Sequence, residues 1–541
     1  MKASLTSSLK VRFLGITPLL KYKGGVLNPQ EIVSLSALLT FKGKSIKKIL
    51  REIRKNNKNL DEEVGKILQL SSLKGHASVA TTPSLSLSYE GSKFLDSVLT
   101  GIYFSSSLVS SGRRTKTIKE DIVFPDKIFF NKKAREIYKE VSERIIDFYN
   151  SLLSQGIRKD EASKILQYGI SGTGIIQLPI ESIVGLKREY LAEKEWMPEE
   201  LGLLLKKIET EFKKLGVDLL YATREAAPRN IYPYPNIFKD PEKSNLAREL
   251  RNKEKLVNGS KLVSMDVLIP PELKKKLTDL DKKTKKAFSS SKLIKKNWFK
   301  LLSYWQEIFR DYNLALKLKV LSSIPWRVWG EKKRHRTCPQ IIESIYFCIE
   351  RAAGKLNQFK KQIETKKIDD KLTGEIEKVF SIPPSIKQNQ QLLAEYLLIA
   401  FQAFDGYKKL INLKIKPREA IFLIPRAVKI DILQEYDLYN LLTGYYPLRL
   451  CSTAEEEMRR NTSREAAEIK KALDEKGYGW LNKFIVPKCQ ILGFCPEERT
   501  CGLIKKRVRG YDENFHREMK EELKNKFREN LKKLGKVDAR Q

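Results

Sequence analysis

The feature of this sequence that most constrains its fold is a weak internal repeat. Shifting the first half by 233 positions places Leu85 on Leu318. Farther along, a shift of 258 positions places Ala162 on Ala420, as one insertion of 25 residues requires. A repeat of this kind predicts two copies of one structural unit. Two helix-rich halves could also produce such matches by chance.

Both halves contain the pattern of a half-buried strand. Leu85, Leu87 and Tyr89 alternate with serines, and apolar residues alternate again over residues 314–320. A period of two is that of a strand with one buried face.

A stretch between the halves is rich in proline, asparagine and lysine, which is typical of a linker. The predicted division is therefore a first module over residues 1–237, a linker over 238–259 and a second module over 260–541.

The 541 residues carry a formal net charge of +37, so the surface attracts anions such as nucleic acid, acidic lipid or phosphorylated metabolites. Lysines scattered over solvated helix faces would explain the charge equally well. No apolar run approaches the roughly 20 residues of a membrane span, so no membrane association is predicted and a cytoplasmic protein is expected.

Six cysteines are too few to indicate a disulfide framework. Cys489, Cys495 and Cys501 are separated by five residues each, which is not a usual zinc spacing. Buried structural thiols are the favoured interpretation, and no metal site is expected.

The stretch RHRTCPQIIESIY holds one of only three histidines in the chain. It resembles the signature of the flavin-dependent thymidylate synthases: Arg-His-Arg, seven residues, Ser, one residue, Arg. Arg334, His335, Arg336 and Ser344 match this pattern, whereas Tyr346 stands in place of the last Arg. Without the correctly spaced serine, a solvated basic turn would be the simpler interpretation.

The first half resembles the same family through other residues. The matches are His76, Ser78, Ser111, Gly112 and Arg113. The first two match an early family His and the Ser or Thr after it, and the last three match the Ser-x-Arg end of the signature. The Arg-His-Arg triplet is lost at residues 101–103. Each match taken alone is also ordinary turn or loop composition.

A third resemblance lies toward the C-terminus. Arg449 matches a family Arg, whereas Asp437 and Tyr439 replace a family Asn and Arg. An Arg at a uracil carbonyl stabilises the charge that develops as the ring carbon becomes nucleophilic. The resemblance therefore implies a catalytic role for Arg449.

The resemblance implies an α+β fold of two tandem modules, each a small antiparallel sheet packed with long helices. The implied reaction is reductive methylation of dUMP to dTMP, with methylenetetrahydrofolate as carbon donor, FAD as carrier and NADPH as reductant. The implied FAD-binding residues are Arg334, His335, Arg336, His76 and Ser78. The implied dUMP-binding residues are Ser111, Gly112, Arg113, Ser344 and Arg449.

Family members are homotetramers, so a homodimer of the fused chain is expected to form a pseudo-tetramer. The two halves have lost complementary parts of the signature, which predicts one composite site where Arg113 and the Arg334–Arg336 triplet converge. Two alternatives stay open. One is a catalytically inactive family member that acts as an interaction protein. The other is a basic nucleic-acid-binding or uridine-modifying protein.

Overall fold

The fold comes from a computed structural model that describes residues 4–22, 25–56, 58–102, 104–111, 115–228, 235–254, 256 and 259–534. Its contacts divide the chain into two compact units. Unit 1 comprises Met1–Asn245, Ile324–Arg336 and Ile342–Ile430, and unit 2 comprises Leu246–Ser323, Thr337–Ile341 and Asp431–Gln541. These units cross the predicted module boundaries, which remain predictions.

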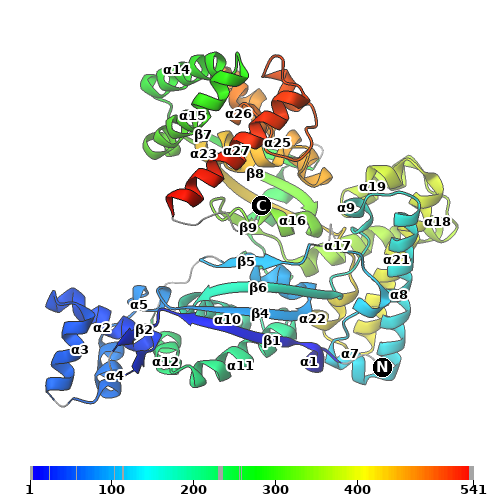
Figure 1. The fold of residues 1–541 in the computed structure, drawn as a ribbon. Coiled ribbons are helices and arrows are strands. Elements are labelled where there is room, and N and C mark those ends of the chain that lie inside the picture. Colours follow the sequence, from blue (N-terminus) through cyan, green and yellow to red (C-terminus); the bar gives the residue numbers. More distant parts are fainter. Residues whose placement is uncertain are drawn as a thin grey trace. The chain divides into compact units, whose positions relative to one another are not determined.

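Each half of the chain contributes one four-stranded sheet (Figure 1). The first has the order β1-β4-β6-β5, with β1 Lys10–Thr17, β4 Ser84–Ser92, β6 Ser171–Pro179 and β5 Ser106–Val109. The second has the order β7-β8-β10-β9, with β7 Ser260–Val267, β8 Leu316–Pro325, β10 Lys429–Asp437 and β9 Gln340–Ile342. The order of the strands along the chain is the same in both sheets, which is the arrangement that a tandem duplication predicts.

The two sheets also share a β-bulge at the same place. In the first sheet the register shifts after the pair Phe13 and Leu87, and in the second it shifts after Leu262 and Val320. Leu87 and Val320 are related by the 233-residue shift. A bulge is a specific local feature of a strand pair, so its repetition supports the internal duplication independently of the sequence matches.

Helices fill most of the remaining chain. Those of the first half are α2 Pro29–Lys42, α3 Ile46–Lys55, α4 Leu60–Leu70, α5 Ser78–Thr81, α6 Lys93–Leu99, α7 Asp126–Phe130, α8 Lys132–Ser154, α9 Lys159–Ala162, α10 Ile180–Ala192, α11 Glu199–Lys214 and α12 Asp218–Ala226. Those that follow are α13 Leu246–Lys253, α14 Pro271–Ala287, α15 Ser291–Tyr312, α16 Trp326–Lys332, α17 Ile345–Gln358, α18 Lys360–Glu364, α19 Asp370–Glu377, α20 Pro384–Lys387, α21 Gln390–Asn412, α22 Pro417–Ala420, α23 Leu438–Leu442, α24 Tyr445–Arg449, α25 Glu456–Glu475, α26 Lys488–Leu492 and α27 Glu513–Lys533. The predicted α+β fold of two tandem modules is confirmed. Among the described residues, no helix has the length and apolar character needed to cross a membrane.

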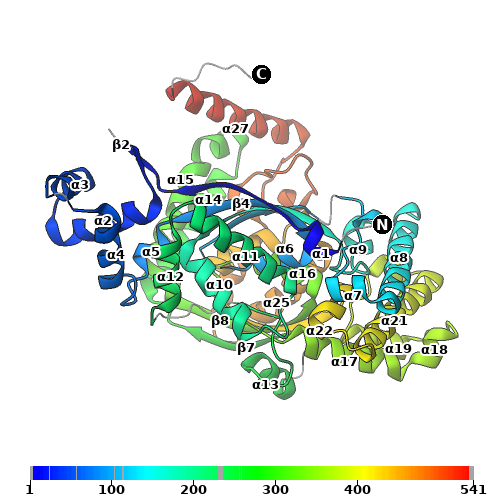
Figure 2. The same cartoon turned by 90° about the horizontal axis from the view of Figure 1, so that it is seen from below.

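The long helices α8 and α21 are equivalent in the repeat and lie side by side in unit 1 (Figures 1 and 2). Tyr138 on α8 donates a hydrogen bond to the carbonyl of Val123 at 2.8 Å. Tyr396 on α21 donates to the carbonyl of Ser381 at 2.9 Å. Both residues of the second pair lie 258 positions after those of the first. The duplication therefore extends to individual buried hydrogen bonds.

Equivalent segments of the two halves also pair with each other in unit 1. Gln167 forms an isolated antiparallel bridge with Pro425, which is its own repeat equivalent. Next to this bridge, the guanidinium of Arg426 lies 4.9 Å from the ring centre of its equivalent, Tyr168. A contact between equivalent residues is the mark of a two-fold interface, here formed within one chain.

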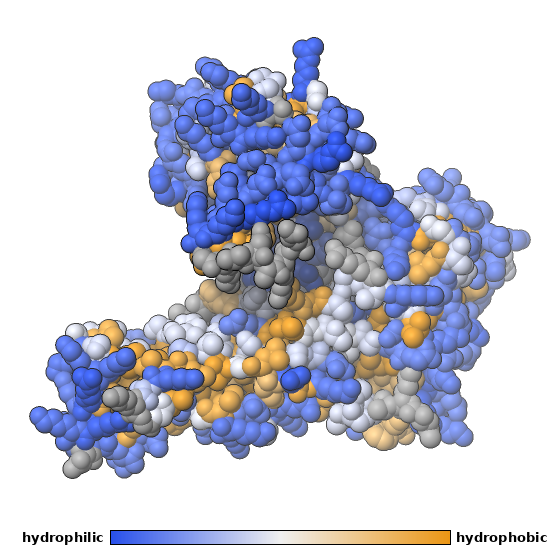
Figure 3. All heavy atoms as spheres, viewed as in Figure 1, coloured by the Kyte–Doolittle hydropathy of each residue, from blue (hydrophilic) through white to orange (hydrophobic). Residues whose placement is uncertain are grey.

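The first sheet is buried on one face. Leu85, Leu87 and Tyr89 are at most 2% exposed, and helices α10 and α11 lie across this side of the sheet (Figure 2). On the other face Ser88 pairs with Ile175, which pairs with Leu108. Ile175 is 48% exposed and Leu108 77%, and hydrophobic residues reach the surface in this region (Figure 3).

The second sheet is buried on both faces. Leu321 and Leu433 are the repeat equivalents of Ser88 and Ile175, and they form a buried cluster with Ala247. Ala247 belongs to helix α13, which lies within the predicted linker. The linker prediction thus covers a segment that contains a helix, and this helix covers the second sheet.

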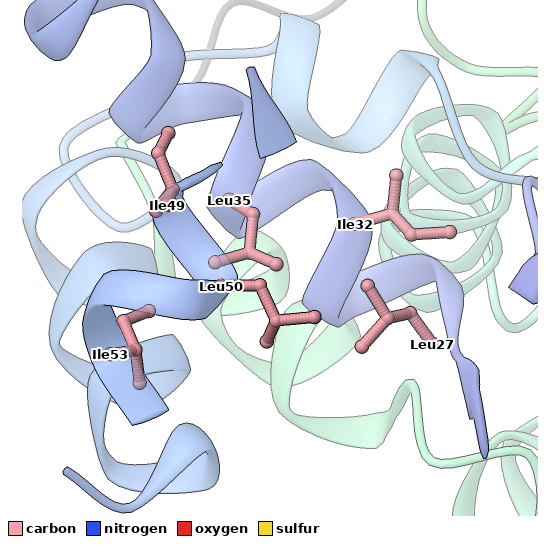
Figure 4. Close-up of a cluster of buried hydrophobic side chains, with 6 residues drawn as sticks. All are labelled: Leu27, Ile32, Leu35, Ile49, Leu50 and Ile53. Carbon is pink, nitrogen blue, oxygen red and sulfur yellow. The ribbon is translucent and has the colours of Figure 1, made fainter. Parts of the chain in front are cut away.

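A separate small core supports the helices inserted after β3 (Gly25–Leu27) in unit 1. Helix α2 begins with a capping box in which Asn28 and Glu31 bond each other's backbone N–H groups. The apolar side chains that pack beneath it are Leu27, Ile32, Leu35, Ile49, Leu50 and Ile53 (Figure 4). This core holds α2 in place, and α2 forms one wall of a pocket described below.

Candidate functional site

The Arg-His-Arg triplet lies in the loop between α16 and β9. Arg334 is exposed, whereas His335 and Arg336 are half-buried. The Arg336 side chain donates from Nε to the carbonyl of Ile102 at 3.0 Å and from Nη2 to the hydroxyl of Ser105 at 3.1 Å. The triplet of the second half therefore binds the segment in which the first half has lost its own triplet.

Lys333, immediately before the triplet, is buried in unit 1. Its ammonium donates to the carbonyl of Ser97 and lies 4.4 Å from the ring centre of Trp329. Burial lowers the pKa of Lys333 well below its ordinary value, and the charge of Arg334 lowers it further. Burial and the charge of Arg334 also lower the pKa of Arg336. Positive charge is thus crowded at the start of this loop.

A second buried cation lies on α6, the repeat equivalent of α16. Lys93 forms an ion pair with Asp96 at 2.8 Å and donates to the carbonyl of Ser110 at 2.6 Å. The hydroxyl of Tyr89 donates to the same Asp96 carboxylate at 2.5 Å. Burial lowers the pKa of Lys93, although Asp96 opposes the shift. Lys93 therefore fixes the backbone one residue before Ser111.

Unit 1 thus brings the triplet loop against Ser97, Ile102 and Ser105 and fixes the beginning of the predicted phosphate-binding segment. Ser111 is half-buried, and its carbonyl accepts a hydrogen bond from the backbone N–H of Thr115 at 3.2 Å. Gly112 and Arg113 lie outside the described residues. Convergence of Arg113 with the triplet therefore stays a prediction.

The end of the signature is folded into the core of unit 1. Ser344 is fully buried, and its hydroxyl donates to the carbonyl of Lys239 at 2.6 Å. Tyr346 is also buried, its ring centre lies 5.0 Å from that of Trp196, and its hydroxyl donates to the Trp196 carbonyl. Tyr346 is therefore a packed residue of unit 1. The predicted nucleotide-binding role of Ser344 is untested, but its hydroxyl already has a partner within the fold.

His76 and Ser78 line a pocket of about 590 Å³ in unit 1. Both side chains are exposed; His76 lies two residues before helix α5, and Ser78 is the first residue of that helix. The other walls come from α2 and α4 and are mainly apolar, with Ile32, Ile67 and the 88% exposed Phe41 among them. The pocket can therefore accept an apolar or aromatic body with a polar group at its His76 edge.

Arg449 ends helix α24 in unit 2 and is half-buried. A buried network anchors this helix: the hydroxyls of Tyr446 and Tyr436 donate to the Glu465 carboxylate at 3.3 and 3.2 Å. The pKa of each tyrosine rises well above its ordinary value, first because of burial and then because of the Glu465 charge. The anchored helix gives Arg449 a defined position.

Asp437 and Tyr439, which replace family residues, have structural contacts in unit 2. The Asp437 carboxylate caps α23 by accepting from the backbone N–H of Asn440 at 2.8 Å. The backbone N–H of Tyr439 donates to the side chain of Asn313 at 2.8 Å.

Lys93 and Lys333 are the site residues that the sequence analysis missed. Lys93 stands beside Phe94 and Leu95 in a helix that is buried throughout. A lysine with an aspartate three residues later in an otherwise apolar stretch was a usable signal, because a buried charge is normally paired. Lys333 had no such signal, since it donates to a backbone carbonyl that is distant in sequence.

Comparison with known proteins finds a similarity to one family over part of the chain. Residues 315–473 match the family described as thymidylate synthase complementing protein. The flavin-dependent thymidylate synthase of Pyrococcus furiosus is 31% identical over 123 residues, which are 23% of this chain and 49% of that protein. Its counterpart in Pyrococcus horikoshii is 33% identical over 124 residues, which are 23% of this chain and 50% of that protein. The chain thus spans about half the length of these relatives.

Solved structures give more distant likenesses. A UMP/dUMP methylase, PolB from Streptomyces cacaoi, bound with 5-Br dUMP, shares 12% identity at a TM-score of 0.32, covering 41% of this chain and 97% of that one. Thymidylate synthase X from Helicobacter pylori, with FAD and dUMP, shares 17% identity at a TM-score of 0.27, covering 40% and 99%. The family match runs from the start of β8 nearly to the end of α25 and includes the whole triplet signature. Within this segment, the chain is similar to the flavin-dependent thymidylate synthases.

Proposed function

We propose that the protein is a flavin-dependent thymidylate synthase that methylates dUMP to dTMP, with methylenetetrahydrofolate and NADPH as co-substrates. The observation that carries the proposal is the crowding of cations around the triplet. Lys333, Arg334 and Arg336 are neighbours in one loop; besides burial, the charges of Arg334 and Arg336 lower the pKa of Lys333, and the charge of Arg334 lowers that of Arg336. A phosphate-bearing ligand would relieve this repulsion through charge-assisted hydrogen bonds.

The side chains present fit an anionic flavin cofactor. Arg334 is exposed and offers its guanidinium fork, while Arg336 is held rigidly by backbone carbonyls. The pocket beside His76 and Ser78 has apolar walls suited to an aromatic ring system. Bound FAD would carry the reducing equivalents and the one-carbon unit.

The other proposed roles concern the nucleotide. Ser111, Gly112 and Arg113 would hold its phosphate, because a hydroxyl, a glycine N–H and a guanidinium together form an anion seat. Arg449 would polarise the uracil carbonyl and stabilise the charge that develops on the ring. Arg449→Lys should bind dUMP nearly as well but lose turnover, since a point charge does not reproduce the guanidinium fork.

Flavin content of the purified protein tests the proposal directly. Arg334→Ala should lose most of the flavin that the unaltered protein retains, because an exposed guanidinium can be removed without disturbing the fold. Arg144→Ala is the matched control, since Arg144 is an exposed arginine of unit 1 whose ion pair is with Glu140 on the same helix. Equal flavin content in both variants would contradict the assignment of the triplet.

A catalytically inactive member is the second candidate, and the buried signature end favours it. Ser344 and Tyr346 have their polar atoms bonded within the fold. On this candidate the protein would retain neither flavin nor dUMP, and dTMP formation would be absent in the unaltered chain. A nucleic-acid-binding or uridine-modifying role would instead show as strongly salt-dependent RNA binding.

The proposed assembly is a homodimer of the fused chain. Unit 1 already contains an internal contact between equivalent segments, so two chains would supply four modules. Light scattering on the purified protein measures this mass directly, and a monomer would contradict it.

A further inference from the structure

A second pocket, of about 420 Å³, lies within unit 2. Its volume is in the range of small-molecule sites, roughly 300–1,000 Å³. One wall is a face of helix α25, on which Arg459, Ser463, Ala467 and Lys470 recur every three or four residues. Helix α25 therefore contributes two cations and a hydroxyl to the same pocket.

Segments from the C-terminal part of unit 2 form most of the other walls, and hydrogen bonds hold them in place. The side chain of Gln490 on α26 donates to the carbonyl of Leu503 at 2.8 Å. The side-chain amide of Asn482 donates to the carbonyl of Lys470 at 3.2 Å and so ties the 3-10 helix Gly479–Phe484 to α25. The walls are therefore joined by the fold itself, and the pocket is preformed.

The charged side chains that line this pocket are all cations. They are Arg459, Lys470 and Lys506, and none of the described lining residues is acidic. In the part of the chain that the structure describes, none of these three side chains forms an ion pair or a hydrogen bond. Lys470 is half-buried, and burial lowers its pKa. Because a cation withdrawn from water is normally paired, the pocket has an excess of positive charge that an anion would neutralise.

The rest of the lining is mainly apolar. Leu450, Ile485, Val486 and Leu503 contribute to it, and these side chains favour contact with a ring or a hydrocarbon chain. A phosphate monoester carries up to about two negative charges and three strong acceptor oxygens. One guanidinium and two ammonium groups match such a group better than they match a carboxylate, which has a single charge.

We propose that this pocket binds an organic phosphate, a phosphate monoester attached to an apolar ring or chain. The phosphate would lie among the three cations, and the organic body would lie against the apolar walls. Leu450 directly follows Arg449, and its backbone N–H donates to the carbonyl of Tyr446 at 2.8 Å. A bound ligand would therefore also restrict the end of α24. An effect on turnover through Arg449 rests on the proposed function, whereas binding to the pocket does not.

Calorimetric titration of the full chain with naphthyl phosphate tests the proposal. We expect saturable binding that weakens as salt is added, because salt screens the three cations. Naphthol has the ring without the charge, and inorganic phosphate has the charge without the ring. Both should bind at least about tenfold more weakly than naphthyl phosphate. Equal affinity for naphthol would overturn the anion site, and equal affinity for inorganic phosphate would overturn the organic body.

Substitution of the lining cations assigns the binding to this pocket. Lys470→Met removes the ammonium and keeps most of the side chain, so affinity for naphthyl phosphate should fall about tenfold through the loss of one charge-assisted hydrogen bond. Lys506→Met should also weaken binding, and its exposed position leaves the fold undisturbed. Lys471→Met is the matched control, because Lys471 is exposed on the same helix and pairs with Glu475. Unchanged affinity in both Lys470→Met and Lys506→Met would overturn the proposal.

Arg334→Ala separates this pocket from the triplet loop of unit 1. The variant should keep its affinity for naphthyl phosphate, whereas loss of binding in Arg334→Ala with full binding in Lys470→Met would assign the phosphate to the triplet and overturn the proposal. Flavin is measured in the same samples, and Lys470→Met should keep the flavin content of the unaltered chain. A chain that binds naphthyl phosphate but retains no flavin would count only against the proposed enzymatic function.

Discussion

The two sheets have the same strand order and the same bulge, but they differ in the solvent exposure of their second face. In the first sheet Ile175 is 48% exposed, whereas its equivalent Leu433 in the second sheet is 6% exposed. The difference comes from α13, whose Ala247 packs on Leu321 and Leu433. The same strand topology can therefore have its second face exposed to solvent or covered. The outcome depends on whether the segment that connects the two halves forms a helix that packs on that face.

The largest effect should come from truncating the covered face. Leu433→Ala should cost about 3–4 kcal/mol of stability, because it removes buried carbon atoms and leaves a cavity. Ile175→Ala, at the equivalent position of the first sheet, should cost less than about 1 kcal/mol, because that side chain is half in water. Chemical denaturation with hydrogen exchange of each strand measures both. Equal losses would show that the two faces are equally buried.

The cover itself is the next target. Ala247→Arg should cost about 3 kcal/mol, because a long charged side chain cannot be accommodated between α13 and the sheet without overpacking or an unpaired charge. Glu249→Arg is the control, since Glu249 is exposed on the same helix. Hydrogen exchange in β8 and β10 should increase only in the first variant, and unchanged exchange there would contradict the covering role of α13.

A third difference is electrostatic. At the end of β4, the buried Glu200 accepts hydrogen bonds from the backbone and hydroxyl of Ser92, whereas the second sheet has Pro325, which offers neither donor. Burial raises the pKa of Glu200 to about 7 from an ordinary 4.5. The folded state therefore binds the proton more tightly than the unfolded state, so stability should rise by about 2–3 kcal/mol as the pH falls through this window.

Glu200→Gln isolates this contribution. Glu419 in the same unit also has a pKa raised to about 7 by burial, so the variant should lose only part of the pH dependence of unit 1. Denaturation midpoints at several pH values between about 4 and 8 measure the difference. An unchanged pH dependence in the variant would show that Glu200 titrates normally.

The smallest expected effect tests a feature that the two halves share, a buried tyrosine hydrogen bond. Tyr138→Phe and Tyr396→Phe each remove a buried hydroxyl that donates to an equivalent carbonyl, so each should cost about 1 kcal/mol. The two losses should agree closely, because both tyrosines are fully buried and their main hydrogen bonds, at 2.8 and 2.9 Å, go to equivalent carbonyls; the second acceptor of Tyr138, the Gly169 carbonyl, is longer at 3.4 Å. Thermal denaturation of the two variants checks this, and clearly unequal losses would limit the repeat to its backbone.

Local patterns allowed part of the fold to be predicted. The alternation at Leu85, Leu87 and Tyr89 correctly indicated β4, because burial of one sheet face follows directly from sequence period. The second alternation was placed slightly too early: Leu314 is 69% exposed in a short 3-10 helix, and β8 begins at Leu316. Strand ends depend on where the partner strand stops, which a local pattern does not record.

Features that depend on distant partners were missed. Helix α13 lies in a polar stretch of sequence. Its Ala247 is buried only because it packs against Leu321 and Leu433, which are far along the chain. Lys333 and Glu200 are charged residues that a sequence analysis assigns to the surface, yet both are buried by tertiary packing. Within the candidate site, the triplet was recognisable from its spacing, but the cations around it were not.

The stacking of Arg426 on Tyr168 has an evolutionary consequence. In a homodimer, a residue at the symmetry axis faces its own copy, so a single mutation changes both sides at once. An arginine there would face an arginine, and the pair would repel. In a chain that contains both copies, the two equivalent positions mutate independently. One of them can then be an arginine and the other a tyrosine, and the guanidinium of Arg426 lies 4.9 Å from the ring centre of Tyr168. In the fused chain, two different residues can therefore face each other at equivalent positions, as Arg426 and Tyr168 do. A symmetric homodimer cannot form such an unlike pair at its axis.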